Sequence, residues 1–209
     1  MFNILKKSQH LIQHFFPCQL CGTDQQDQYS ICQNCWEQLP WMNQVITKQE
    51  ISFYIACQYH FPIDRVIQKF KYEHQLHWQN LLTGLILQLP LPKVQAIVPM
   101  PISEARLIER GYNQTLEIAK HVGKVLNIPI WQPIERIHQH TQKGLDRFER
   151  IENIQNQFKM IKTQKQLPYR RVLILDDVVT TGSSVLALKL KLEQMGCQNV
   201  YACAIASTD

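Results

Sequence analysis

One segment near the C-terminus, Val172 to Val185 with the sequence VLILDDVVTTGSSV, restricts the fold of this chain more than any other feature. It begins with four apolar residues typical of a buried strand and leads into a helix predicted over Ser183–Met195, with Gly196 as its stop. Another strand is predicted over Val200–Ala206. A strand, a helix and a strand in this order are typical of a parallel sheet with crossover helices.

The preceding residues continue this alternation of strands and helices. Their apolar patterns predict a strand over Ile51–Tyr59, a helix over Asp64–Leu89, a strand over Val94–Val98 and a helix over Ser103–Leu126. We therefore expect an α/β fold, with a doubly wound and mostly parallel sheet over residues 48–209. Residues 1–47 are expected to form a small N-terminal module, because the paired cysteines lie there.

Four of the seven cysteines form two CxxC pairs. The pairs are Cys18 with Cys21 and Cys32 with Cys35, and each can place two thiolates on one metal ion. Two pairs complete a tetrahedral sulfur shell that suits zinc, so we expect a closed, structural site. A redox-active pair is the competing interpretation, although a single CxxC would suffice for it. The remaining cysteines lie among apolar residues and are interpreted as buried hydrophobes: Cys57, Cys197 and Cys203.

Two carboxylates and a hydroxyl-rich loop follow the strand predicted at Val172–Leu175. In an open α/β sheet, ligands bind at the carboxyl ends of the strands, where Asp176 and Asp177 are expected. The N-terminus of the next helix offers unpaired N–H groups, so the loop from Thr180 to Ser184 is expected to hold a phosphate. Because carboxylates repel phosphate, the aspartates are expected to face a sugar diol with a divalent cation nearby.

Other interpretations of this segment explain less of it. A helix cap at Thr180 accounts for one hydroxyl but not for four within five residues beside paired acids. A Walker B strand requires a GxxxxGK[ST] phosphate loop, and no such loop occurs in the chain. The absence of a GxGxxG sequence also argues against a dinucleotide-binding site.

Several motifs together resemble one known family. LILDDVVTTGSS resembles the phosphoribosyl pyrophosphate (PRPP) signature of type I phosphoribosyltransferases. The segments VPMPISEARLIERGYNQTLEIAK (98–120) and KGLDRFERIENIQNQF (143–158), the paired CxxC and, more weakly, FKY (70–72) resemble the ComF family of late competence proteins. The resemblance covers nearly the whole chain.

The resemblance implies roles for individual residues. Asp176 and Asp177 would be catalytic residues that bind the ribose hydroxyls, and the 5-phosphate would lie on the loop of Thr180, Thr181, Gly182, Ser183 and Ser184. Arg106 and Arg110 would be catalytic residues that supply charge for pyrophosphate, with Lys71 as a further contact, although a solvated helix face explains these three equally well. Arg147 and Arg150 would lie on a flexible loop that covers the site.

The ComF resemblance implies a cytoplasmic protein of natural transformation that binds PRPP with magnesium and helps to handle incoming single-stranded DNA beside other competence proteins. Two alternatives stay open, an active phosphoribosyltransferase with an unknown acceptor and a non-catalytic adaptor of the uptake machinery. Transfer would displace pyrophosphate from the anomeric carbon, yet no residue identifies an acceptor base. The candidates for DNA contacts are the basic run from Lys159 to Arg171 and four aromatic residues, Trp36, Trp41, Tyr112 and Trp131.

No membrane insertion is expected, because the longest apolar runs are interrupted well below the roughly 20 residues that a spanning helix needs. The first 16 residues include Lys6 and Lys7 and lack the pattern of a signal peptide. The net charge of +5 is small for 209 residues and favours a phosphate-rich partner only mildly.

Overall fold

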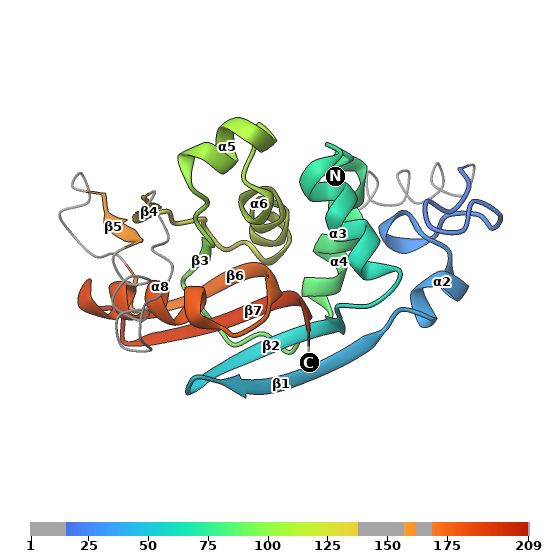
Figure 1. Cartoon of the computed structure of the whole chain (residues 1–209). Coiled ribbons are helices and arrows are strands. Elements are labelled where there is room, and N and C mark those ends of the chain that lie inside the picture. The colour runs from blue at the N-terminus through green and yellow to red at the C-terminus, as the bar shows by residue number, and fades with distance from the viewer. Residues whose placement is uncertain (1–15, 138–156, 162–168, 209) are drawn as a thin grey trace, which may run out of the picture.

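The computed structural model describes residues 16–137, 157–161 and 169–208, and a five-stranded sheet lies at their centre (Figure 1). The strands lie in the order β1, β2, β7, β6 and β3. Four of them are parallel, namely β2 (Ile51–Gln58), β7 (Asn199–Ser207), β6 (Arg171–Val179) and β3 (Ala96–Pro99). β1 (Trp41–Lys48) pairs antiparallel with β2 at one edge. This sheet confirms the mostly parallel α/β fold expected from the sequence.

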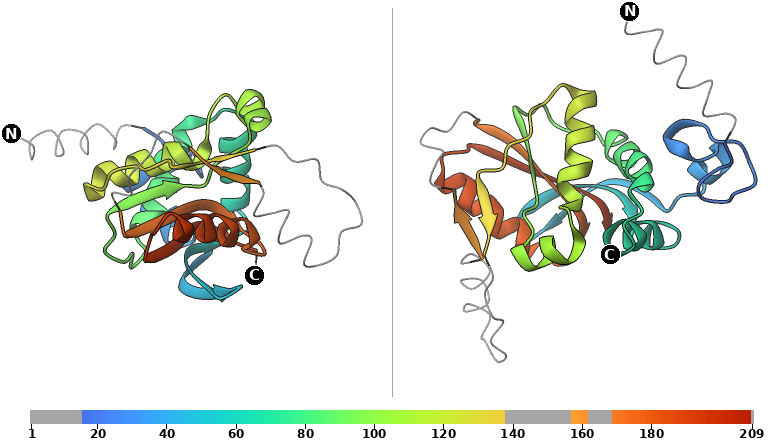
Figure 2. Two further views of the ribbon diagram at one scale, coloured as in Figure 1. Left: turned by 90° about the vertical axis from the view of Figure 1, so that its left-hand side faces the viewer. Right: turned by 90° about the horizontal axis from the view of Figure 1, so that it is seen from above.

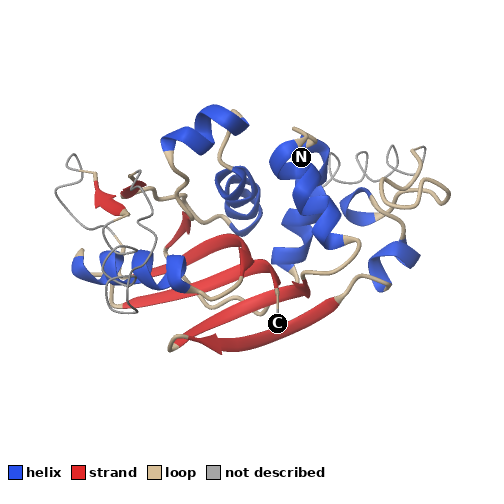
Figure 3. Ribbon diagram, in the orientation of Figure 1, coloured by secondary structure: helices blue, strands red, loops and turns tan. Residues whose placement is uncertain are grey.

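Helices cover both faces of the sheet (Figures 2 and 3). One face carries α3 (Ile63–Tyr72), α4 (Gln79–Leu87) and α6 (Gln114–Leu126), and the other carries α8 (Ser183–Gln194). In β6, Leu173 and Leu175 pack toward the first three helices, whereas Ile174 packs toward α8. Because both faces are buried, the strand is apolar at every position from 172 to 175 rather than at alternate positions.

The single helix expected over Asp64–Leu89 is divided in the structure. α3 ends at Tyr72, and His74 adopts a left-handed conformation with φ of 54°. A short 3-10 helix, Leu76–Trp78 (η2), then leads into α4. Apolar residues continue at helical spacing through the break, so periodicity alone does not locate it.

The helix expected over Ser103–Leu126 is also two helices. α5 (Glu104–Arg110) ends at Gly111, whose φ of 71° is readily adopted by glycine. Asn113 then begins α6, because its Oδ1 accepts the backbone N–H groups of Thr115 and Leu116. In the described part of the chain, no helix combines the length and apolar character that crossing a membrane requires.

The strand that carries the two aspartates is longer than the sequence predicts. The expected strand ended at Leu175, but β6 continues to Val179, so Asp176 and Asp177 lie within the strand rather than after it. Asp176 is paired in register with Ala204 of β7. The neighbouring strand extends the ladder through residues of low strand propensity, and tertiary pairing overrides that local preference.

The cysteine-containing segment packs directly on the helices of the sheet. It includes η1 (Gln28–Ser30) and α2 (Gln33–Glu37). The ring of Tyr29 lies over Gly84 of α4 so closely that a Cβ at residue 84 would overlap the ring. Asn80 Nδ2 also donates to Ser30 Oγ at 2.8 Å. The division expected between residues 47 and 48 stays a prediction. β1 lies almost wholly N-terminal to that division, yet it pairs with β2, which lies C-terminal to it.

A two-stranded ribbon lies at the opposite end of the molecule from the cysteines (Figure 2). It consists of β4 (Ile134–Arg136) and β5 (Phe158–Met160), which pair antiparallel. The sequence did not predict these strands, because three residues are too few to show a period. Phe158 is buried against the α8 side of the sheet.

Candidate functional site

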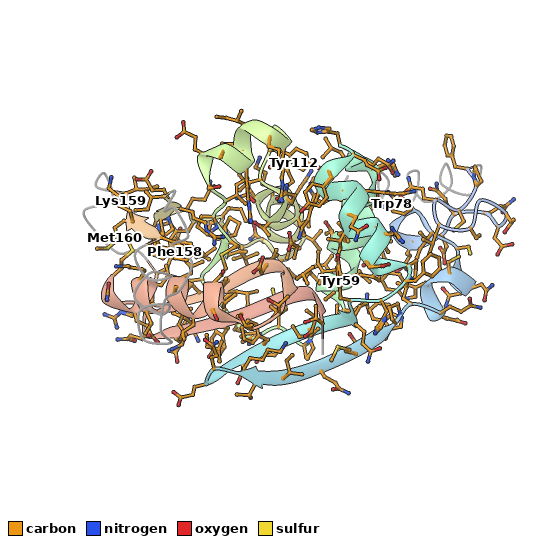
Figure 4. All side chains as sticks on the ribbon, viewed as in Figure 1. Tyr59, Trp78, Tyr112, Phe158, Lys159 and Met160 are labelled. Atoms are coloured by element: carbon orange, nitrogen blue, oxygen red, sulfur yellow. The ribbon has the colours of Figure 1, made fainter. Side chains whose placement is uncertain are left out.

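A cavity of about 440 Å³ lies where β6, α3, α5, α6 and β4 meet. It brings together seven residues that the sequence placed in the site: Lys71, Arg106, Arg110, Asp176, Asp177, Thr180 and Ser184. It also contains residues that the sequence did not indicate, among them Tyr59, Tyr72, Gln114, Thr115 and Arg136. Figure 4 shows Tyr59 beside the sheet below α3.

The two aspartates form the acidic side of the cavity. Lys71 Nζ lies 2.7 Å from Asp177 Oδ1, and these two side chains are only 17% and 14% exposed. The backbone N–H of Asp177 donates to Asp176 Oδ1 at 2.8 Å. Burial, together with the negative charge of Asp177, raises the pKa of Asp176 to about 7. The α3 lysine therefore stabilises one carboxylate while the other holds its proton to near neutral pH.

Arg110 forms the most buried part of the basic side. Its side chain is 7% exposed, so it does not lie on a solvated helix face, whereas Arg106 is exposed. The guanidinium donates to Gln114 Oε1 and to the Tyr72 hydroxyl, both at 3.1 Å, and lies 4.7 Å from the centre of the Tyr72 ring. Among the described residues, no carboxylate forms an ion pair with Arg110. Arg110 Nε and Gln114 Nε2 are buried donors without partners in this part of the chain.

Arg136 adds a third arginine, contributed by the ribbon strand β4. Its guanidinium donates to Gln157 Oε1 at 2.8 Å and lies 5.5 Å from the centre of the Phe158 ring. Burial and the nearby positive charge of Arg106 lower the pKa of Arg136. No local motif marks this residue, because its position depends on pairing with residues more than 20 positions away.

The hydroxyl-rich loop has only two residues in the cavity wall, Thr180 and Ser184. Gly182 has φ of 78° and precedes the first turn of α8, whose N–H groups begin at Ser183. The hydroxyls of Thr181 and Ser183 lie 3.0 Å apart. The two arginines expected on a covering loop, Arg147 and Arg150, lie outside the described residues.

The four cysteines of the CxxC pairs form a second candidate site. The sulfur atoms of Cys18, Cys21, Cys32 and Cys35 all lie within 4.8 Å of one another, and those of Cys21 and Cys32 are 3.9 Å apart. Four sulfurs bound to one zinc ion at about 2.3 Å would be about 3.8 Å apart. Backbone N–H groups point at two of the sulfurs, as in the bond from Cys32 N to Cys18 Sγ at 3.2 Å. The cluster therefore fits one tetrahedral metal ion.

The aromatic residues considered for DNA contacts have structural roles. Trp36 stacks on Tyr29 at 5.1 Å between ring centres and contacts the edge of Trp41 at 4.8 Å. Trp131 is 5% exposed and packs on Tyr169. Tyr112 donates its hydroxyl to the backbone oxygen of Phe70, which joins the α5–α6 connection to α3 (Figure 4).

The basic run from Lys159 to Arg171 is described only in part. Lys159 Nζ lies 3.5 Å from Glu135 Oε1 across the two-stranded ribbon. Lys159 is labelled on this ribbon in Figure 4. Arg170 and Arg171 are exposed, and their backbone N–H groups donate to Gln95 Oε1. Lys162 and Lys165 lie outside the described residues.

Comparisons with known proteins return relatives along almost the whole chain. Competence protein F of Haemophilus influenzae is 32% identical over 211 residues, which cover 95% of this chain and 87% of that protein. DNA utilization protein YhgH of Escherichia coli K12 is 25% identical over 206 residues, which cover 91% of this chain and 84% of that protein. No protein-family model matches.

Similar solved structures have lower identity. Glutamine PRPP amidotransferase from B. subtilis is 11% identical, with 66% of this chain and 30% of that chain covered and a TM-score of 0.44. Orotate phosphoribosyltransferase from Aeropyrum pernix is 14% identical, with 65% and 63% covered and a TM-score of 0.39. These likenesses concern the fold alone.

Proposed function

This chain belongs to the family of competence protein F, and on that premise we propose that it acts in DNA uptake as a cytoplasmic protein that binds PRPP with magnesium. The observation that carries the proposal is the charge arrangement of the cavity. Arg110 is buried without a carboxylate partner among the described residues, and paired aspartates form the other side. A buried guanidinium without a negative partner costs free energy and favours an anionic ligand. The aspartates can accept hydrogen bonds from the hydroxyl groups of a sugar.

The proposed ligand fits this arrangement group by group. Asp176 and Asp177 would accept the ribose hydroxyls, and the loop from Thr180 to Ser184, with Thr181, Gly182 and Ser183 between them, would hold the 5-phosphate. Arg106 and Arg110 would bind the pyrophosphate, since a guanidinium can grip phosphate oxygens with two donors. Arg136 extends this basic side. Magnesium would offset the negative charge of the pyrophosphate beside the aspartates.

We propose binding of PRPP and name no acceptor for a transfer. A phosphoribosyltransferase would need Arg106 and Arg110 to stabilise the departing pyrophosphate, without a nucleophilic side chain. A non-catalytic member of the family would use the same residues to sense PRPP. Arg147 and Arg150 stay predicted as residues of a covering loop.

Calorimetric titration with PRPP, with and without magnesium, tests the site. The decisive variant carries Asp176→Asn and Asp177→Asn, which keep the side-chain volume but remove both carboxyl groups. We expect magnesium-dependent binding by the natural protein and at least a hundredfold loss of affinity in the variant, since each charged hydrogen bond contributes about 1.5 to 3 kcal/mol. Full PRPP affinity in a folded variant would refute the site.

We also propose that the protein contacts single-stranded DNA and other competence proteins; the names of its relatives refer to competence and to DNA utilization. The exposed side chains of Arg170 and Arg171 are candidates for phosphate contacts. DNA affinity should fall steeply with salt if the backbone is bound, with a smaller slope in the Arg170→Gln, Arg171→Gln variant. No DNA binding even at low salt would instead point to an adaptor that contacts only proteins.

A further inference from the structure

The β1–β2 hairpin contacts the hydroxyl-rich loop, although neither of its contacting residues lines the cavity. Lys48, at the end of β1, donates from Nζ to the backbone oxygen of Thr180 at 2.5 Å and to Ser207 Oγ at 3.1 Å. Gln49, in the turn, donates from Nε2 to Ser183 Oγ at 2.9 Å. These bonds join the loop to residues 132 and 134 positions earlier in the chain.

The loop rests directly on this hairpin. A Cβ at Gly182 would lie 3.2 Å from Cζ of Phe53 in β2 and 3.5 Å from Cβ of Lys48. Gln49 and Glu50 have φ of 48° and 62°, so both residues of the turn are left-handed. Such a turn matches the twist of paired strands but is rarely built without glycine. From this turn, the side chain of Gln49 extends to Ser183 of the loop.

The bond from Lys48 fixes how one peptide group of the loop is turned. In a trans peptide, the C=O of one residue and the N–H of the next point in opposite directions. While the Lys48 ammonium holds the Thr180 oxygen, the N–H of Thr181 must point away from Lys48, in the opposite direction within the peptide plane. An outward carbonyl and an inward N–H are what an anion-binding loop needs, since a carbonyl oxygen facing the anion would repel it.

We propose that Lys48 is a positioning residue that keeps the loop oriented for the 5-phosphate of PRPP. The inference rests on the proposed PRPP site, and it assigns to the β1–β2 hairpin a part in that site. Because Lys48 acts on the loop and not on the arginines, its effect is confined to the phosphate end of the ligand.

Three ligands separate this role from general structural support. In Lys48→Met, we expect affinity for PRPP and for ribose 5-phosphate to fall roughly tenfold, about 1.4 kcal/mol, while affinity for inorganic pyrophosphate changes less than twofold. Lys48→Arg should recover most of the loss, since it keeps the charge and the donors. The control is Lys93→Met, which removes the same charge from an exposed lysine before β3.

Unchanged PRPP affinity in Lys48→Met, or an equal loss for all three ligands, would overturn the proposal. Hydrogen exchange of residues 180–184 in the ligand-free protein gives an independent measure: exchange should accelerate in Lys48→Met and not in Lys93→Met. If the natural protein binds none of the three ligands, the proposed function fails. The exchange rates then decide by themselves whether Lys48 holds the loop.

Discussion

Asp176 makes the stability of the protein depend on pH. Burial and Asp177 raise the pKa of its carboxyl from 3.8 to about 7. Between these values the native state binds more protons than the unfolded chain, so the free energy of unfolding falls as pH rises from about 4 to 7. Relative to Asp176→Asn, the natural protein should lose on the order of 1 to 3 kcal/mol over this range. Urea unfolding at a series of pH values measures the difference.

The matched control is Glu109→Gln, which removes a carboxylate from the exposed surface of α5. Its stability should follow that of the natural protein at every pH. Parallel curves for the natural protein and Asp176→Asn would show that this carboxyl is not held protonated by its surroundings.

If Arg110 binds pyrophosphate as proposed, it should do so at the expense of stability, because its charge is buried. Replacing buried charged groups with apolar side chains of similar volume is often neutral or stabilising, provided that no oppositely charged partner is left unpaired. Among the described residues, Arg110 has no such partner. In Arg110→Met we therefore expect the free energy of unfolding to stay unchanged or rise by about 1 kcal/mol, and PRPP affinity to fall at least tenfold. Thermal unfolding and calorimetry on one preparation test both parts.

The comparison for this prediction is Arg106→Met. Arg106 is exposed, so its loss should leave stability unchanged and weaken PRPP binding less than the loss of Arg110. A strongly destabilised Arg110→Met would mean that the bonds to Tyr72 and Gln114 outweigh the cost of burying the charge.

At the scale of elements, the close approach of Tyr29 to Gly84 joins the cysteine-containing segment to α4. A methyl group at residue 84 would overlap the Tyr29 ring. Gly84→Ala should therefore cost about 1 to 3 kcal/mol of unfolding free energy despite the better helix propensity of alanine. Chemical denaturation measures this cost.

A double-mutant cycle identifies the cause. If the ring is responsible, Gly84→Ala should be nearly neutral, or slightly stabilising, when it is introduced into Tyr29→Ala. The same cost in both backgrounds would place the clash elsewhere in α4.

The elements that the sequence predicted well are those whose pattern is local. β2, β3, β7 and α8 depend on apolar runs and on Gly196, so their approximate bounds could be read directly. The breaks at His74 and Gly111 were missed because apolar spacing continues across them, although Gly111 and Asn113 are recognisable helix-end signals. The ribbon of β4 and β5 has no local signal, since each strand has only three residues.

The same distinction applies to the candidate site. The aspartates and the hydroxyl-rich loop lie in one continuous motif, and the structure brings Thr180 and Ser184 to the cavity beside them. Lys48 and Arg136 reach this region from distant segments, through the hairpin and the ribbon. Such residues become visible only after strand pairing is known, because no spacing in the sequence records it.

For the whole molecule, the parallel sheet explains why one cavity contains residues from so many segments. The carboxyl ends of parallel strands meet at one edge, which is where ligands bind in open α/β sheets. β6 supplies the acids and the loop, and α3, α5 and β4 supply the cations. Among the described residues of the cavity, one ion pair joins its acidic and basic sides, that of Lys71 with Asp177.

The four-cysteine cluster belongs to the same core as the sheet and helices, so metal loss should affect the entire molecule. Cys18 and Cys32 are buried in the cluster of apolar residues that also contains α4. We expect about one zinc ion per chain, lost in the Cys18→Ser, Cys21→Ser variant together with a lower melting temperature. Elemental analysis and thermal unfolding give the two values. Cys57→Ser is the control, because it changes a buried cysteine that is not one of the four clustered cysteines and should keep the metal. Metal-free natural protein after gentle purification, or full metal content in the double variant, would contradict a structural zinc site.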